Sequence, residues 1–214
     1  MSKYLVLFVV VLVGVGVYQL VKYIKGRRGR AMVDISDLVS VELEEYGPEL
    51  ALLESTGLPF FVDGRSGFGK FLLRFPEEDG ARSYFFDYAC LLGSGNDQHK
   101  KQSTVALFDF EKGAFPDFHL SAGGDVPNEA TGLEPADMTE FAGLPPGVKL
   151  YGRDQAALKK LFTPEISACF GEHPGWSAQG SGRFLVMYKG CALVDTGKYR
   201  QFIAEANKLA FNLA

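Results

Sequence analysis

The hydrophobic pattern opens with an uninterrupted apolar run close to the first residue. Residues 4–24 read YLVLFVVVLVGVGVYQLVKYI, and the first charge in this run is Lys22. A helix rises about 1.5 Å per residue and a bilayer core is about 30 Å thick, so roughly twenty apolar residues cross it. In lipid the backbone must satisfy its own hydrogen bonds, which enforces a helix even on Val and Gly. The run therefore predicts one N-terminal transmembrane helix whose partner is the lipid bilayer.

Two other interpretations of this run fit less well. A cleaved signal peptide carries a basic front and a small-residue cleavage site, whereas only Lys3 precedes the run and basic residues follow it. A buried core helix is seldom apolar on every face over such a length. We therefore expect residues 4–24 to span a membrane.

The charges beside the run predict its orientation. Lys3 stands alone before it, while five basic residues lie at or just beyond its end: Lys22, Lys25, Arg27, Arg28 and Arg30. Lys and Arg close to a span stay on the cytoplasmic side during insertion. We expect an inner-membrane, single-pass protein with its N-terminus outside and its C-terminal domain in the cytoplasm. We interpret the basic collar as a topology signal, without specific lipid recognition.

Beyond residue 58 the pattern changes to short aromatic and β-branched runs separated by turns that contain Gly and Asp. Such runs are typical of antiparallel hairpins. The expected strands are 59–63, 70–75, 82–92, 103–110, 115–120, 148–151, 176–179 and 183–188. Residues 64–69 are expected to form a turn, and 121–146 a long loop.

Helical patterns flank and interrupt these runs. Residues 31–57 predict a helical neck that is broken at Gly47-Pro48. Asp154 and Thr163 are expected to cap two short helices. The clearest pattern ends the chain, with apolar residues at helical spacing: Tyr199, Phe202, Ile203, Ala206, Leu209, Ala210 and Leu213.

These elements predict an α+β fold, in which an antiparallel sheet of hairpins is packed by a C-terminal helix and preceded by one transmembrane helix. Residues 1–30 form the anchor with its basic collar, 31–57 the helical neck and 58–214 a soluble α+β domain. That domain is long enough to bury a core without disulfides or metals.

Charge and cysteine content limit the choice of partner and compartment. Six of the twenty-two basic residues fall within the first thirty positions, so sixteen face twenty-six acidic residues in the rest of the chain. Nucleic acid is excluded as a partner because phosphates require clustered Lys and Arg. The cysteines, Cys90, Cys169 and Cys191, are odd in number and widely spaced, which favours buried thiols in a reducing compartment over a disulfide framework.

Several local motifs resemble reactive sites, but none predicts one. Residues 64–70 match GxxxxGK, yet a P-loop continues with Ser or Thr and a helix, whereas Phe71 and a strand pattern follow. Cys169 and His173 form a lone C-x-x-x-H pair without a second ligand cluster. We therefore predict no metal and no cofactor.

Three other polar residues lie within the predicted strands. Asp87 and Asp109 are flanked by aromatic residues on two strands that we expect to pair, and His119 should face away from its apolar neighbours. Two carboxylates brought together can perform acid–base chemistry if their pKa values split. Contact with solvent or with an arginine such as Arg74 explains each carboxylate better than acid–base chemistry does. No catalytic residue is assigned, and the roles of these residues stay open.

Four segments together resemble a family of uncharacterised bacterial membrane-anchored proteins. They are FFDYACLLGSG, QSTVALFDF, FPDFHL and EFAGLPPGVKLYGRDQAALKKLFTP. The matching residues are Phe86, Asp87, Tyr88, Gln102, Thr104, Val105, Phe108, Pro116, Phe118, Leu120, Glu140, Phe141, Tyr151, Gly152, Asp154, Leu161 and Phe162. The chain departs from the pattern at Ala89-Cys90, at the inserted Ser103 and in the Gly-rich run after Leu120. The resemblance implies a membrane-attached bacterial protein and carries no established activity.

Three functions are compatible with these observations. The first is a membrane-tethered interaction or scaffold module with a membrane-protein partner. The second is a domain that binds a small molecule or a lipid headgroup. The third is a hydrolase whose site is assembled only in three dimensions.

Overall fold

The computed structural model describes residues 26–62, 65–92, 99–123 and 131–214. The apolar run at 4–24 lies outside these ranges. Within them, none of the helices has the length and apolar character needed to cross a bilayer.

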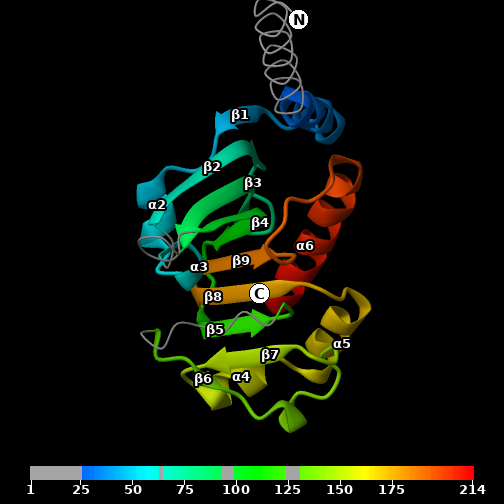
Figure 1. Ribbon diagram of the computed structural model, residues 1–214. Helices are drawn as coiled ribbons and strands as arrows, with labels where there is room; N and C mark the ends of the chain where they lie inside the picture. Colours follow the sequence, from blue (N-terminus) through cyan, green and yellow to red (C-terminus); the bar gives the residue numbers. More distant parts are fainter. Residues whose placement is uncertain (1–25, 63–64, 93–98, 124–130) are drawn as a thin grey trace, which may run out of the picture.

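A nine-stranded antiparallel sheet forms the centre of the molecule (Figure 1). In chain order its strands are β1 (Leu43–Tyr46), β2 (Arg65–Arg74), β3 (Ala81–Leu92), β4 (His99–Phe110), β5 (Phe115–Ser121), β6 (Glu134–Pro135), β7 (Lys149–Gly152), β8 (Ser177–Gly182) and β9 (Phe184–Tyr188). Their spatial order is β1-β2-β3-β4-β9-β8-β5-β7-β6. The hairpins predicted at β3–β4 and β8–β9 are therefore confirmed, and β9 joins β4 to complete one continuous sheet.

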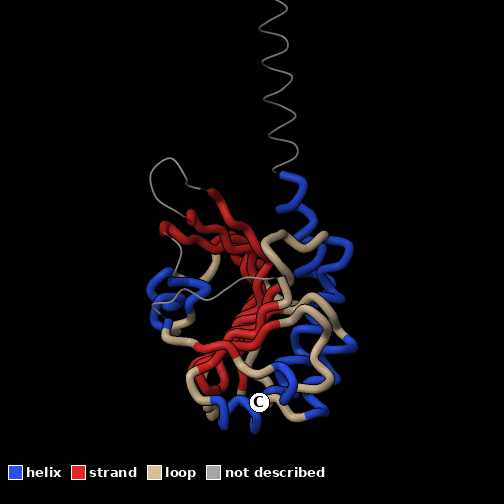
Figure 2. The backbone as a smooth tube through the Cα atoms, turned by 60° about the horizontal axis from the view of Figure 1, so that its bottom comes forward, coloured by secondary structure: helices blue, strands red, loops and turns tan. Residues whose placement is uncertain are grey.

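Helices cover both faces of this sheet (Figure 2). One face carries residues 26–39, α4 (Gln155–Leu161), α5 (Pro164–Glu172) and α6 (Tyr199–Leu213), and the other carries α2 (Leu50–Ser55) and α3 (Pro59–Val62). Successive side chains of a strand point to opposite faces, so Phe85 packs under α6 while Phe86 packs under α3. Burial on both sides explains why the sequence of β3 is almost continuously apolar.

The C-terminal helix α6 confirms the periodicity found in the sequence. All seven residues of its predicted apolar stripe are buried. Asp195 caps the preceding 3₁₀ turn by accepting a hydrogen bond from the Gly197 N–H. Asp154 and Thr163 likewise cap α4 and α5, as predicted.

Two predicted elements near residue 60 were wrong. Residues 59–62 form the helix α3 instead of a strand, since Pro59 suits a first helical turn and consecutive Phe60 and Phe61 are both buried against the same core. The turn predicted at 64–69 is instead the first half of β2. Its glycines serve close packing, because a Cβ placed on Gly67 would lie 2.0 Å from the Tyr88 hydroxyl.

The neck expected at residues 31–57 also differs from its prediction. One helix runs through residues 26–39, so the end of the basic collar and the start of the neck share a helix. Met32 and Ile35 on this helix are buried in the core beneath α6. Ser40, with φ of 53°, ends the helix, and residues 43–46 then add β1 to the edge of the sheet. The neck is thus part of the folded domain.

Candidate functional site

A largely buried polar cluster joins the first described helix to the sheet, and we call it the joint. Arg28 comes from the helix at 26–39, Asp87 from β3 and Thr104 from β4. Asp87 and Thr104 face each other in the strand register. Val194 precedes the 3₁₀ turn that leads into α6, and Tyr199 is the first residue of α6. Four segments far apart in sequence therefore meet here.

Arg28 forms a bidentate ion pair with Asp87 at the centre of the joint. Its Nε donates to Asp87 Oδ2 at 2.5 Å, and its Nη2 donates to Asp87 Oδ1 at 2.7 Å. Its Nη1 donates to the Val194 carbonyl oxygen at 2.8 Å. The planar guanidinium matches a carboxylate in this geometry, which a lysine could not reproduce.

Thr104 completes the network. Its hydroxyl donates to Asp87 Oδ1 at 2.9 Å and accepts a hydrogen bond from the Val194 N–H at 2.9 Å. The side chain of Asp87 is 8% exposed and that of Arg28 is 20% exposed, so the ion pair is largely withdrawn from solvent.

The surroundings of the joint favour the charged form of Arg28. Burial lowers the pKa of Arg28, but the hydrogen bond and charge of Asp87 outweigh this effect and raise it above its ordinary value. Burial, followed by the negative charge of Asp87, raises the pKa of Tyr199 far above its usual range. Both Asp87 oxygens accept hydrogen bonds from protein donors. The arrangement is suited to fixing a helix on a sheet rather than to proton transfer.

The structure does not bring Asp87 and Asp109 together. Asp109 lies opposite Arg82 and points to the other face of the sheet, where it forms an ion pair with Arg183. Arg74, considered above as a partner for either carboxylate, contacts Glu44 instead. No carboxylate pair forms, so the acid–base hypothesis for these residues receives no geometric support.

His119 faces away from Phe118 and Leu120, as predicted, and is almost fully buried. The Tyr188 hydroxyl lies 3.4 Å from its Nε2 atom, and the ring of Tyr151 is 6.1 Å away. His119 therefore lies among other polar side chains on the face that carries α3.

A hollow of about 260 Å³ opens at this face of the sheet. Asp117, two residues before His119, lies in its wall and accepts a hydrogen bond from the Ser181 hydroxyl at 2.7 Å. Arg153 lies 3.3 Å from the same carboxylate and is mostly exposed. Pro59 and Leu133 add apolar surface. The hollow thus presents a carboxylate and a guanidinium beside apolar walls.

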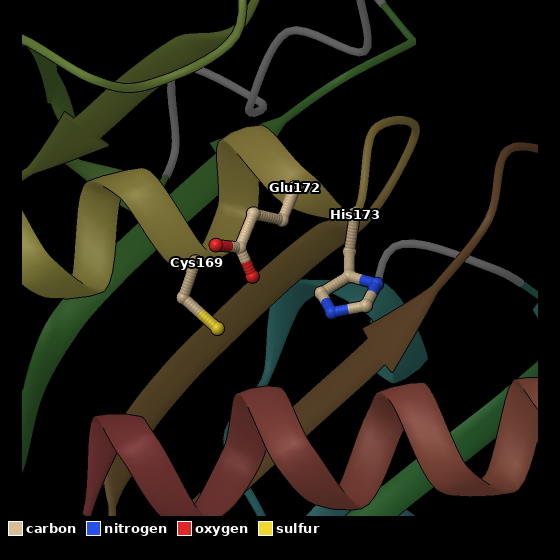
Figure 3. A group of neighbouring side chains, drawn as sticks. All are labelled: Cys169, Glu172 and His173. Carbon is tan, nitrogen blue, oxygen red and sulfur yellow. The ribbon is translucent and has the colours of Figure 1, made fainter.

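The lone Cys169 and His173 pair gains a neighbour in the structure. Glu172 brings a third donor atom, and the three ligand atoms lie within 4.8 Å of one another at the end of α5 (Figure 3). The Lys208 ammonium group, however, lies 3.2 Å from Glu172 Oε2 and 3.1 Å from His173 Nε2. The ammonium group of Lys208 therefore already contacts two of the three donor groups.

The cysteines are all free thiols, but only Cys90 is buried. Burial raises the pKa of the Cys90 thiol, which makes it a poor nucleophile. The expectation of buried thiols thus holds for one residue of the three.

Sequence reasoning missed the role of Arg28, which was explained as one member of a topology signal. A usable signal was present, because Arg28, Met32, Ile35 and Val39 recur at helical spacing and define one face. Met32 and Ile35 are buried on that face, which places Arg28 toward the sheet. An arginine in line with a buried stripe indicates a partner within the core.

Comparison with known proteins supports the fold. No protein-family model matches the sequence, and no curated protein matches it either. The crystal structure of the mycobacterial trehalose monomycolate transport factor A, TtfA, is similar, with a TM-score of 0.62, 10% sequence identity and coverage of 87% of this chain and 96% of that chain. At this identity the likeness shows a shared α+β fold with a large antiparallel sheet and a C-terminal helix. The resemblance to a family of membrane-anchored proteins stays a prediction.

Proposed function

We propose that the chain is a membrane-tethered accessory or scaffold module, anchored by residues 4–24 with its N-terminus outside and its domain in the cytoplasm. The observation that carries this proposal is the joint. The helix that follows the apolar run directly is fixed to β3 and β4 by a largely buried ion pair between Arg28 and Asp87. This attachment supports the proposal, because an anchor that leads into a helix fixed on the sheet would present one defined surface of the domain to a membrane partner.

The fold neighbour and the charge distribution support this proposal. TtfA is a trehalose monomycolate transport factor, and a shared fold is compatible with an accessory role beside a membrane process. The basic collar follows the apolar run closely, which favours a cytoplasmic domain.

The proposal is tested on the full chain in cells. We expect the protein to stay with membranes after alkaline carbonate washing, and a periplasm-dependent reporter fused after Ala214 to be inactive. Photo-crosslinking from Leu38 or Val62, which are 57% and 56% exposed, should give a discrete adduct with a membrane protein. Release by carbonate, an active reporter or a lack of adducts at native expression would each contradict it.

The hollow beside Asp117 favours a second candidate, a site for a small polar molecule or a lipid headgroup. An ion pair with apolar walls can orient a ligand that carries both an amine or hydroxyl group and an anionic group. We expect a thermal shift with a member of a metabolite and headgroup panel that disappears in Arg153→Ala. Since Arg153 is mostly exposed, that variant should keep the melting temperature of the unliganded protein. A uniform response across the panel would remove this candidate.

A further inference from the structure

Exposed apolar side chains gather at one corner of the sheet, where β1, β2 and β3 lie side by side. Tyr46 is 73% exposed, Phe68 46% and Leu91 36%. Tyr46 pairs with Lys70 in the strand register, and Leu91 pairs with Lys100. We call the surface formed by these five residues the sheet corner.

The lysines of the sheet corner stand over its central aromatic ring. The Nζ of Lys70 lies 5.7 Å from the centroid of the Phe68 ring, and the Nζ of Lys100 lies 5.9 Å from it. An exposed aromatic ring between two ammonium groups matches the composition of segments that sit at membrane interfaces, where rings reach the headgroup level and lysines meet phosphates. Lysine is depleted in protein–protein interfaces, so a protein partner fits this surface less well.

The sheet corner also lies near the helix at residues 26–39, which follows the apolar run in the sequence. Lys70 pairs with Asp87, the residue that binds Arg28 on the first described helix. Gly29 of that helix lies beside the ring of Phe71, the next residue of β2 after Lys70. Figure 1 shows this helix at the end of the molecule that carries β1 and β2. The bilayer that holds residues 4–24 would thus face this end.

We infer that the sheet corner rests on the anionic headgroups of the bilayer that anchors the chain, an inference that depends on the proposed function. Phe68, Tyr46 and Leu91 enter the headgroup region, and Lys70 and Lys100 pair with lipid phosphates. Each lysine near an anionic surface adds a favourable electrostatic contribution to membrane binding. The rest of the domain is acidic and is repelled, but charges farther than about 8 Å are screened at physiological salt. The domain therefore stands on this corner instead of lying flat.

The test uses the full chain in liposomes whose acyl chains carry bromine, a quencher of tryptophan fluorescence at short range. The natural Trp176 is 1% exposed and supplies the baseline. In vesicles with phosphatidylglycerol, we expect Phe68→Trp to lose at least half of its added emission, and in phosphatidylcholine alone to lose much less. Val62→Trp, at an exposed apolar position on α3, is the matched control and should be quenched in neither.

The contribution of the lysines is tested by K70E/K100E in the Phe68→Trp background. These changes should reduce the quenching in anionic vesicles to the level in phosphatidylcholine, as should 1 M salt. Carbonate extraction, measured in parallel, tests the membrane anchor separately from the contact of the sheet corner with headgroups. If carbonate extracts the protein, the proposed membrane anchor at residues 4–24 is contradicted. If the protein is retained but tryptophans at positions 62 and 68 are quenched equally, only the contact of the sheet corner with lipid is contradicted. Persistent quenching in K70E/K100E would also overturn it.

Discussion

Phe202→Asp is expected to prevent the whole domain from folding. The Phe202 side chain is 3% exposed, and its ring stacks on Trp176 at 4.8 Å between centroids and also contacts Phe85. Removing a buried phenyl ring costs about 3–5 kcal/mol, and an unpaired buried carboxylate adds several more. The sum approaches or exceeds the 5–15 kcal/mol that holds a typical domain together.

The local pattern of the C-terminal helix, taken by itself, predicts that this substitution unfolds the C-terminal half. The structure enlarges the effect, because Phe85 belongs to β3 and sits in the same core as Met32 of the first helix. Detergent-solubilised protein should lose its near-ultraviolet circular dichroism and become sensitive to trypsin along its length. The matched control is Arg200→Asp, at an exposed position of the same helix, which should stay folded. A folded, protease-resistant Phe202→Asp protein would contradict the packing described for α6.

Local periodicity was sufficient to predict the hairpins and α6, because both patterns repeat within ten to fifteen residues. It could not predict that β9 pairs with β4, or that β8 pairs with β5. These pairings join strands that are dozens of residues apart, and no spacing within either strand specifies its neighbour. Strands buried on both faces make the strand order harder to predict. Their sequences are apolar throughout and lack the alternation of apolar and polar residues that would identify the buried face of the sheet.

The α3 error has a similar origin. Phe60 and Phe61 have high strand propensity, but both are buried against Phe86 and Tyr88 above the sheet. The Phe60 N–H donates to Gln179 Oε1 at 2.8 Å, on a strand more than a hundred residues later. Tertiary packing overrode local preference, and the deciding partner was invisible from the local sequence. The identity of the partner of Arg28 was hidden for the same reason, since Asp87 and Arg28 are brought together only by the fold.

Arg28→Ala is expected to lower the free energy of unfolding by about 3 kcal/mol, because it leaves Asp87 largely buried without its counter-charge. Asp87→Asn should cost a similar amount, since the guanidinium then loses its charged partner. The double variant should lose clearly less than the sum of the two single variants, as expected for residues in direct contact. The measurement is urea unfolding of the full chain in detergent, followed by tryptophan fluorescence.

An exposed ion pair supplies the matched control. Arg74 contacts Glu44 at 3.0 Å, with side chains that are 55% and 43% exposed. Arg74→Ala should therefore cost less than about 1 kcal/mol. Equal losses in Arg28→Ala and Arg74→Ala, or strict additivity of the Arg28 and Asp87 variants, would show that the joint is not the strong contact that the geometry indicates.

The Asp87→Asn variant also tests how firmly the helix at residues 26–39 is attached to the sheet. In the wild-type protein, trypsin should cleave slowly after Arg27 and Arg30, since their helix is packed on the core through Met32 and Ile35. With Asp87→Asn, the first turns of that helix lose their attachment to β3, and cleavage should accelerate at least several-fold under conditions where the sheet stays folded. Under the proposed function, a domain loosened in this way would stay with its membrane anchor but would no longer present one fixed surface. Loss of crosslinked partners in Asp87→Asn, at unchanged membrane retention, would then separate the role of the joint in orientation from that of the anchor.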